Sequence, residues 1–353
     1  MIVPGHLAAR SCVPQDDVNN RARYWHTTDD GRVQCDLCPR YCTMRDGQAG
    51  FCSVRRNTDG MLELTAYGYP SGLAIDPIEK KPLYHVMPGA RVLSFGTTGC
   101  NLACRFCQNW ELSTSRAGGL AGRPMSPEAM VAVALENGCQ GIAYTYNDPV
   151  IFAEYAIDVA ETAHQAGLLN IAVTAGYIEP EPRADFFVHM DAANVDMKAM
   201  DPAFYRTLTG GRLDVVQDTL RYLAHETDVW VEVTNLVIPG LNDSEAGIRE
   251  LSAWVATEMG PDVPLHLSAF HPSHRMMDVP RTPASTLFEA RCIALDAGLR
   301  FVYTGNVADE DGGTTWCWSC HQPLIERRGF QVVANRLVDG HCRCGALIPG
   351  CWG

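Results

Sequence analysis

The stretch RVLSFGTTGCNLACRFC, residues 91–107, decides the fold and the chemistry expected of this chain. Its first half, Arg91–Gly96, is a short apolar run that predicts a buried β-strand. Its second half is a loop with Cys100, Cys104 and Cys107 at CxxxCxxC spacing. Three thiolates this close together can hold three corners of an iron–sulfur cubane. Because no fourth cysteine lies in this loop, the fourth iron would stay open to a small molecule, as catalytic metal sites keep one position free.

Strand-like runs that each end in a polar loop recur after this motif, with helix-like segments between them. We predict strands at Gly141–Tyr146, Asn170–Thr174, Ala193–Met197, Val229–Asn235, Pro264–Ala269 and Arg300–Thr304. Helix starts are indicated where a capping side chain precedes a proline, at Ser126-Pro127, Asp148-Pro149, Asp201-Pro202 and Thr282-Pro283. This alternation predicts parallel strands in an α/β fold. We expect a partial or full β/α (TIM-like) barrel, with a doubly wound open sheet as the alternative.

Two small cysteine-rich modules are expected to flank this barrel, so we divide the chain into residues 1–90, 91–308 and 309–353. In the N-terminal module, four soft ligands at close spacing fit either tetrahedral zinc or an auxiliary iron–sulfur cluster; they are Cys35, Cys38, Cys42 and Cys52. The C-terminal module has a zinc-ribbon pattern, although its second pair is CxC rather than the usual CxxC. Its candidate zinc ligands are Cys317, Cys320, Cys342 and Cys344.

Composition excludes several other classes of protein. The net charge of −13 gives the chain no overall attraction to phosphate backbones, so nucleic acid is not expected as a partner. No apolar run reaches the roughly 20 residues that a membrane span needs. Met1–Asn20 lacks the pattern of a secretory signal, and most of the 15 cysteines are clustered, as in metal sites of a reducing compartment. We therefore expect a cytoplasmic protein. Cys139 and Cys292 lie outside the clusters in apolar surroundings, and we expect both to pack in the core.

The CxxxCxxC loop after a first barrel strand, with Phe106 just before its last cysteine, resembles the radical S-adenosylmethionine (SAM) superfamily. The resemblance implies that Cys100, Cys104 and Cys107 hold a [4Fe-4S] cluster whose open iron chelates the amino and carboxylate groups of S-adenosylmethionine. It implies reductive cleavage of that cofactor to a 5′-deoxyadenosyl radical, which takes a hydrogen atom from a substrate. Phe106 would then pack near the adenine.

Other strand-end motifs are similar to those of glycyl-radical activating enzymes. Tyr146, Asn147 and Asp148 stand where the family binds the cofactor's amino group, although Asp148 could also simply cap the helix at Pro149. Thr174 corresponds to a Thr-Asn-Gly turn in which this chain has alanine instead of asparagine. The Asp-x-Lys motif implies that Lys198 positions the cofactor. The family's remaining cofactor contacts fall on Asp196, Ile238 and His271, the last of which could be an ordinary loop histidine.

Over its whole length the chain resembles the AmmeMemoRadiSam-system radical SAM enzymes, which are related to pyruvate formate-lyase activating enzymes. The resemblance rests on residues 35–40, 69–72, 84–85, 96–110 and 348–350. It implies an oxidoreductase-type enzyme that abstracts hydrogen from a small-molecule or peptide substrate and takes electrons from a donor such as flavodoxin or ferredoxin. The alternatives are an enzyme that installs a glycyl radical on a partner protein, or a zinc-binding interaction protein without catalysis.

Overall fold

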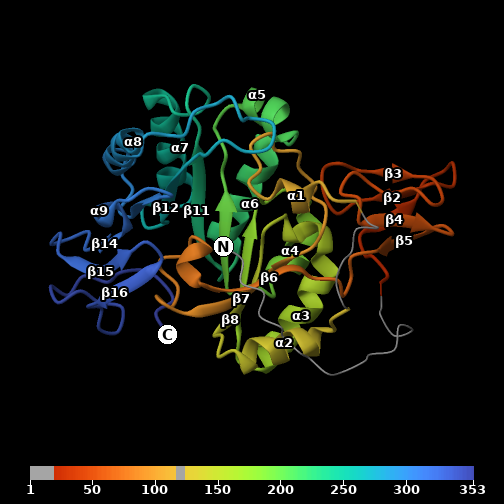
Figure 1. The fold of residues 1–353 in the computed structure, drawn as a ribbon, viewed down its shortest axis with the longest axis horizontal. Coiled ribbons are helices and arrows are strands. Elements are labelled where there is room, and N and C mark those ends of the chain that lie inside the picture. Colours follow the sequence, from red (N-terminus) through yellow and green to blue (C-terminus); the bar gives the residue numbers. More distant parts are fainter. Residues whose placement is uncertain (1–19, 117–123) are drawn as a thin grey trace.

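The computed structural model describes residues 20–116 and 124–353. Cys12 and nearly all of the segment Met1–Asn20 lie outside the described residues. Three parts follow one another along the chain: small N-terminal sheets, a central mostly parallel sheet with helices, and a small C-terminal sheet (Figure 1). The N-terminal and C-terminal sheets lie on opposite sides of the central sheet.

The central sheet has eight strands in the order β13-β12-β11-β10-β9-β8-β7-β6. Neighbouring strands from β7 to β13 pair in parallel, and β6 pairs with β7 antiparallel at one edge. The strands are β6 Ser71–Pro77, β7 Arg91–Gly96, β8 Gly141–Tyr144, β9 Leu169–Thr174, β10 Ala192–Asp196, β11 Trp230–Val237, β12 Leu265–Ala269 and β13 Val302–Gly305.

The strand order confirms a partial barrel and decides against the doubly wound alternative. A doubly wound sheet reverses its order at a switch point, whereas these strands follow one another without reversal. Right-handed crossovers in one direction place the connecting helices on one face of the sheet. The sheet is open, because β13 and β6 are its two edges and do not pair with each other. All seven predicted strands are present, with ends shifted by a few residues at most.

Helices connect the strands and cover their outer face. They are α1 Trp110–Ser113, α2 Pro127–Glu136, η3 Pro149–Phe152, α3 Ala153–Gln165, α4 Pro180–Phe187, α5 Pro202–Phe204, η4 Tyr205–Thr209, α6 Leu213–Glu226, α7 Glu245–Glu258, α8 Ala284–Asp296 and α9 Glu310–Gly313. Ser126, Asp148 and Asp201 cap their segments as predicted. Thr282 does not cap α8, because its hydroxyl donates to Val237 O at 2.6 Å and accepts from Phe270 N at 3.0 Å.

The two faces of the sheet bury different cores. Leu93 and Phe95 of β7 pack outward into the main core with the helices, whereas Val92 packs inward with a smaller cluster. That inner cluster includes Ile78 and Leu83, from a segment that begins with the short helix η2 (Ile78–Lys80) and follows β6. Alternate residues of a strand face opposite sides, so the inner face is lined by every second side chain. The inner segment therefore fills the space that the open sheet curves around.

The N-terminal module consists of two small sheets, with β1 Trp25–Thr27, β2 Val33–Cys35, β3 Thr43–Met44, β4 Arg55–Thr58 and β5 Met61–Leu64. A buried ion pair joins it to the barrel. Arg55 and Glu154 of α3 are 2% and 3% exposed, and both terminal nitrogens of the guanidinium donate to the carboxylate at 2.8 Å. Such a bidentate pair fixes orientation as well as distance. The module is thus held rigidly against α3.

The C-terminal module has the strands β14 Thr315–Trp316, β15 Pro323–Arg328 and β16 Gln331–Asn335. Its Arg327 is 2% exposed and contacts the segment that follows β6. There the guanidinium donates to Tyr84 O at 2.7 Å and lies 3.5 Å from the carboxylate of Glu79. Buried charges need such partners. The contact therefore joins the C-terminal module to the segment between β6 and β7.

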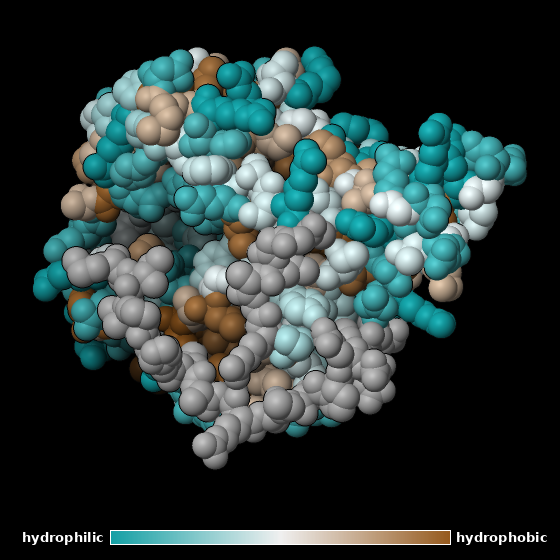
Figure 2. Space-filling view, turned by 45° about the vertical axis from the view of Figure 1, so that its right-hand side comes forward, coloured by the Kyte–Doolittle hydropathy of each residue, from teal (hydrophilic) through white to brown (hydrophobic). Residues whose placement is uncertain are grey.

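The surface of the described part is mainly hydrophilic in the view of Figure 2, with hydrophobic residues gathered chiefly in one hollow. Among the described residues, no helix has both the length and the apolar character to cross a membrane. Cys139 is buried as expected, but Cys292 is exposed on α8, so the expectation that it packs in the core is wrong. A helix position that looks apolar in sequence can still lie at the edge of the buried stripe.

Candidate active site

A cavity of ≈ 260 Å³ lies among the loops at the carboxyl ends of the parallel strands. This is the end of a β/α barrel where functional side chains gather. All three cysteines of the CxxxCxxC loop line the cavity, together with seven of the nine residues predicted to bind a cofactor. Those seven are Phe106, Tyr146, Asn147, Asp148, Thr174, Asp196 and Lys198.

Hydrogen bonds from the β8 end hold the cysteine loop in place. The side-chain amide of Asn147 donates to Gly99 O at 2.9 Å and to Thr97 Oγ1 at 3.2 Å, and its oxygen accepts from Thr97 N at 3.2 Å. The backbone approaches closely here, because a Cβ on Gly96 would lie 2.6 Å from the Asn147 oxygen. The side chain of Asn147 therefore fixes the position of the loop that carries Cys100.

The three cysteines of the loop line the cavity and are partly exposed. Leu102 N donates to the sulfur of Cys100 at 3.4 Å, and Cys107 Sγ lies 3.4 Å from Ser113 Oγ. Burial raises the pKa of Cys100 well above its ordinary value. Burial also raises the pKa of Cys104 to about 11, against a lowering effect of the Lys198 ammonium. Buried thiolates need a positive partner, so this site suits a metal-bound state of the sulfurs.

Asp196 and Lys198 form an ion pair at the end of β10. Lys198 Nζ lies 2.9 Å from Asp196 Oδ2, and the two side chains are 11% and 39% exposed. Burial by itself lowers the pKa of Lys198, but Asp196 and Cys104 outweigh it and hold that pKa above its ordinary value. The ammonium also lies 5.9 Å from the ring centroid of Phe106. The cavity thus contains a fixed positive charge beside the cysteines.

Asp148 has the structural role of a cap and also joins two loops. Its Oδ1 accepts from Val150 N at 3.2 Å and from Thr174 Oγ1 at 2.8 Å, and its Oδ2 accepts from Ala175 N at 3.2 Å. Burial raises its pKa, against these hydrogen bonds, which lower it. An ionised carboxylate has about four acceptor positions. One position on Oδ2 therefore remains for a donor in the cavity.

The structure does not bring Ile238 and His271 to this cavity. Ile238 is fully buried, and its amide donates to Asn242 Oδ1 at 2.6 Å. His271 is half-buried in the loop after β12 and is absent from the cavity lining. Another part of that loop does meet the cysteine motif, where Ser273 Oγ donates to Cys107 O at 3.0 Å.

Several polar residues that line the cavity were not predicted. Thr234 of β11 is 8% exposed, and its hydroxyl has no hydrogen-bond partner among the described residues. Ser268 lies near the end of β12, and Asn306 follows β13 with φ of 60°. Ser268 and Asn306 could have been found from their position, because each lies at the carboxyl end of a strand. Thr234 lies in the middle of β11, so its sequence position gave no such signal.

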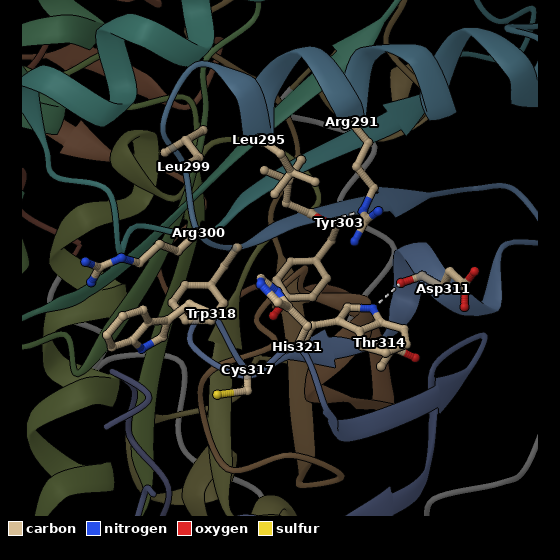
Figure 3. Close-up of a pocket in the computed structure, with 13 residues that line it drawn as sticks. Arg291, Leu295, Leu299, Arg300, Tyr303, Asp311, Thr314, Cys317, Trp318 and His321 are labelled. Atoms are coloured by element: carbon tan, nitrogen blue, oxygen red, sulfur yellow. Dashed lines mark hydrogen bonds between the residues drawn. The ribbon is translucent and has the colours of Figure 1, made fainter. Parts of the chain in front are cut away.

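A second, larger cavity of ≈ 470 Å³ shares no lining residue with the first. Figure 3 shows Arg291, Leu295 and Leu299 from the α8 side above it and Trp318 and His321 of the C-terminal module below it. Neither arginine is free, because Arg291 donates to Val302 O at 2.9 Å and Arg300 pairs with Asp262 at 2.9 Å. Of the candidate cysteines only Cys317 lines this cavity, and it belongs to the C-terminal set, so we assign the chemistry to the smaller cavity, which all three cysteines of the CxxxCxxC loop line.

The two flanking cysteine sets have different geometries. In the C-terminal set, the sulfurs of Cys317, Cys320, Cys342 and Cys344 all lie within 4.8 Å of one another, so the short CxC pair still supplies both ligands. The N-terminal set lines a small cavity, and among the described residues it does not meet the close spacing of the C-terminal set. A sulfur is about 2.3 Å from zinc in a tetrahedral site, which places neighbouring sulfurs about 3.8 Å apart. The C-terminal set matches this, with sulfur pairs at 3.6 and 3.7 Å.

Comparison with known proteins identifies the family. Residues 95–251 match the model of the radical SAM superfamily. An uncharacterized protein of Methanocaldococcus jannaschii is 42% identical over 330 residues, 93% of this chain and 98% of that protein. The 4-hydroxyphenylacetate decarboxylase activating enzyme of Clostridioides difficile is 23% identical over 161 residues, 43% of this chain and 51% of that enzyme.

Among solved structures, a radical SAM methyltransferase from Sphaerobacter thermophilus has 17% sequence identity and a TM-score of 0.49, over 62% of this chain and 68% of that chain. The family match and the cavity at the strand ends indicate the same kind of protein. The chain belongs to the radical SAM superfamily, and it is an enzyme of the radical SAM type that uses S-adenosylmethionine and a [4Fe-4S] cluster.

Proposed function

We propose that Cys100, Cys104 and Cys107 hold the [4Fe-4S] cluster, and that the cavity beside them binds S-adenosylmethionine. The observation that carries this proposal is the convergence of three partly exposed cysteines, an ion pair and polar strand ends on one cavity that no other cysteine lines. When bound, cluster and cofactor supply a 5′-deoxyadenosyl radical that removes a hydrogen atom from a substrate.

The residues of the cavity fit such a ligand. The unpartnered hydroxyl of Thr234 and the remaining acceptor position of Asp148 are buried polar groups that a polar ligand would satisfy. We assign the cofactor's ammonium to Asp148 and its carboxylate to Lys198, whose positive charge is held in place by Asp196. Phe106 supplies an apolar wall beside the ammonium of Lys198. Asn147 acts as a positioning residue, because its amide is used by the cysteine loop.

The substrate we propose is a small molecule or one side chain of a peptide. The loop after β12 crosses the cysteine motif through Ser273 and through Arg275, whose amide donates to Arg105 O at 2.9 Å. These contacts narrow the entrance on that side, which disfavours a folded partner protein and the installation of a glycyl radical.

The test is cofactor cleavage by the full chain, purified and reduced without oxygen. We expect 5′-deoxyadenosine and methionine by mass spectrometry when S-adenosylmethionine and dithionite are supplied. Cys104→Ala should abolish both products. Cys292→Ala is the matched control, because Cys292 is exposed on α8 and away from the cavity. If Cys104→Ala cleaved the cofactor as fast as Cys292→Ala, the ligand assignment would be wrong.

We also propose zinc for the C-terminal set, on the basis of its tetrahedral sulfur spacing. The pKa of Cys344 is lowered to about 7, chiefly by the amide of Ala346, which favours the thiolate that a metal binds. Every cysteine in the described ranges is unpaired, which supports a reducing, cytoplasmic setting. A reduced carrier protein of the flavodoxin or ferredoxin class would supply electrons there.

A further inference from the structure

The N-terminal cysteine set, Cys35, Cys38, Cys42 and Cys52, is in backbone contact with the CxxxCxxC loop. A Cβ on Gly99 would lie only 2.0 Å from Cys52 O, so the N-terminal module and the CxxxCxxC loop are in backbone contact. Arg40 Nε donates to Asn101 O at 2.8 Å, on the other side of Cys100. With standard bond lengths, the Cα atoms of Cys52 and Cys100 are within about 10 Å of each other. The two sets of ligands are therefore neighbours.

The cavity of the N-terminal set differs from a zinc site. A cavity of ≈ 20 Å³ is lined by Cys35, Cys38, Cys42 and Cys52 together with seven other residues. Four sulfurs about 2.3 Å from one zinc leave no such room. In the C-terminal set, by contrast, all four sulfurs lie within 4.8 Å of one another. The wider arrangement suits a cubane, whose four ligands bind four different irons.

Two buried donors at this cavity have no acceptor among the described residues. Arg40 Nη2 and Arg55 Nε are buried without a hydrogen-bond partner in residues 20–116 and 124–353, and both residues line the cavity. Arg55 is 2% exposed and cannot turn away, because Glu154 binds the other two nitrogens of its guanidinium. Unpaired buried donors are costly. The bridging sulfides of a cluster are acceptors that a lone zinc ion would not bring, and hydrogen bonds to sulfur are common around such clusters.

We propose that Cys35, Cys38, Cys42 and Cys52 hold a second [4Fe-4S] cluster, which passes electrons to the cluster of the CxxxCxxC loop. The relay role rests on the function proposed above, whereas the presence of the cluster does not. One electron from a reduced carrier protein reduces the second cluster, and the same electron then reduces the cluster at Cys100. No proton or bond change is involved.

Metal content tests the cluster directly. The anaerobically purified full chain should contain about eight irons, about eight sulfides and about one zinc. A content of about four irons and two zincs would overturn the proposal, since zinc would then occupy the N-terminal set. Cys42→Ser should lose about half of the iron and keep the zinc. Cys104→Ala should keep the other half, and complete loss of iron in that variant would also overturn the proposal.

The same variants show whether the second-cluster proposal or the proposed cleavage of S-adenosylmethionine fails. If Cys104→Ala keeps about four irons but the wild type does not cleave S-adenosylmethionine, the proposed function fails and the second cluster stands. The relay predicts that Cys42→Ser cleaves the cofactor with dithionite but not with reduced ferredoxin. Equal activity with both reductants would refute the relay.

A second variant keeps the proposal testable if Cys42→Ser does not fold. Arg40→Gln removes a guanidinium that faces the cavity and also stacks 3.9 Å from the ring centroid of Phe51. We expect unchanged iron content and a more negative reduction potential of one of the two clusters, because a hydrogen-bond donor and a positive charge near the sulfurs are lost. Potentials identical to those of the wild type would refute the assignment of that donor.

Discussion

Replacement of Lys198 by methionine is the substitution that best separates cofactor binding from folding. Methionine keeps the apolar stem beside Phe106 and removes the ammonium. The structure limits the cost to folding, because Asp196 remains 39% exposed and its carboxylate can be solvated when its partner is lost. Cys104 and its neighbours in the loop are left in place. We therefore expect unchanged iron content and a similar thermal midpoint.

The expected loss lies in the affinity for S-adenosylmethionine. A hydrogen bond to a charged group contributes about 1.5–3 kcal/mol, and here the ammonium is 11% exposed, so water screens it little. That free energy corresponds to a dissociation constant raised about 10- to 150-fold. Anaerobic calorimetric titration of the cofactor measures it. Lys80→Met is the matched control, because Lys80 is 47% exposed and pairs with Asp76 outside the cavity lining. An affinity within about twofold of the control would refute the role of Lys198.

Three further predictions concern stability and the zinc site. Glu154→Gln should lower the free energy of unfolding by about 3–5 kcal/mol, because it leaves the charge of Arg55 buried without a counter-charge; chemical denaturation that finds less than about 1 kcal/mol would contradict this. Burial lowers the pKa of His85 to about 4 from 6.5, so the unfolded chain binds more protons between these values and stability falls as pH drops through this window, by up to about 3 kcal/mol. The fall between pH 6.5 and 5 should be smaller in His85→Asn, and denaturation curves with equal slopes would exclude His85 as its source. Cys320→Ser should lose the zinc and lower the thermal midpoint while iron is kept, and metal analysis that still finds zinc would reject the C-terminal assignment.

The apolar patterns were sufficient to predict the parallel strands, because strands buried on both faces read as short continuous apolar runs. Strand β6 could not be found this way. Ser71–Pro77 begins with small and exposed residues, and it joins the sheet only through antiparallel pairing with β7. Edge pairing is a non-local property, so a strand that is half exposed leaves little local signal.

The chemistry of single side chains was harder to predict than their positions. Asp148 and Thr282 both precede a proline, yet only Asp148 caps, because Thr282 has better partners in two distant strand ends. Asn147 lies at the cavity as expected, but its hydrogen bonds to the neighbouring loop became visible only with the fold. Local sequence indicates which groups are available, whereas tertiary contacts decide which acceptor each donor takes.

The cysteine sets illustrate the same limit. Spacing alone indicated four soft ligands in each flanking module, and it left zinc and a cluster as alternatives for the N-terminal set. The distance between sulfurs depends on how two separate hairpins meet, which spacing does not encode. For the C-terminal set, the hairpins bring the CxC pair and the CxxC pair within tetrahedral reach despite the shortened second turn.

The central claim is that the protein leaves one iron of the CxxxCxxC cluster open for S-adenosylmethionine. Electron–nuclear double resonance tests it on reduced Cys42→Ser protein, in which only this cluster should remain, with the cofactor labelled with ¹⁵N at its amino group. We predict a ¹⁵N coupling that shows the amino group bound to iron, and its loss when unlabelled cofactor is used. A reduced cluster whose spectrum shows no coupling to the labelled nitrogen, at saturating cofactor, would contradict the account.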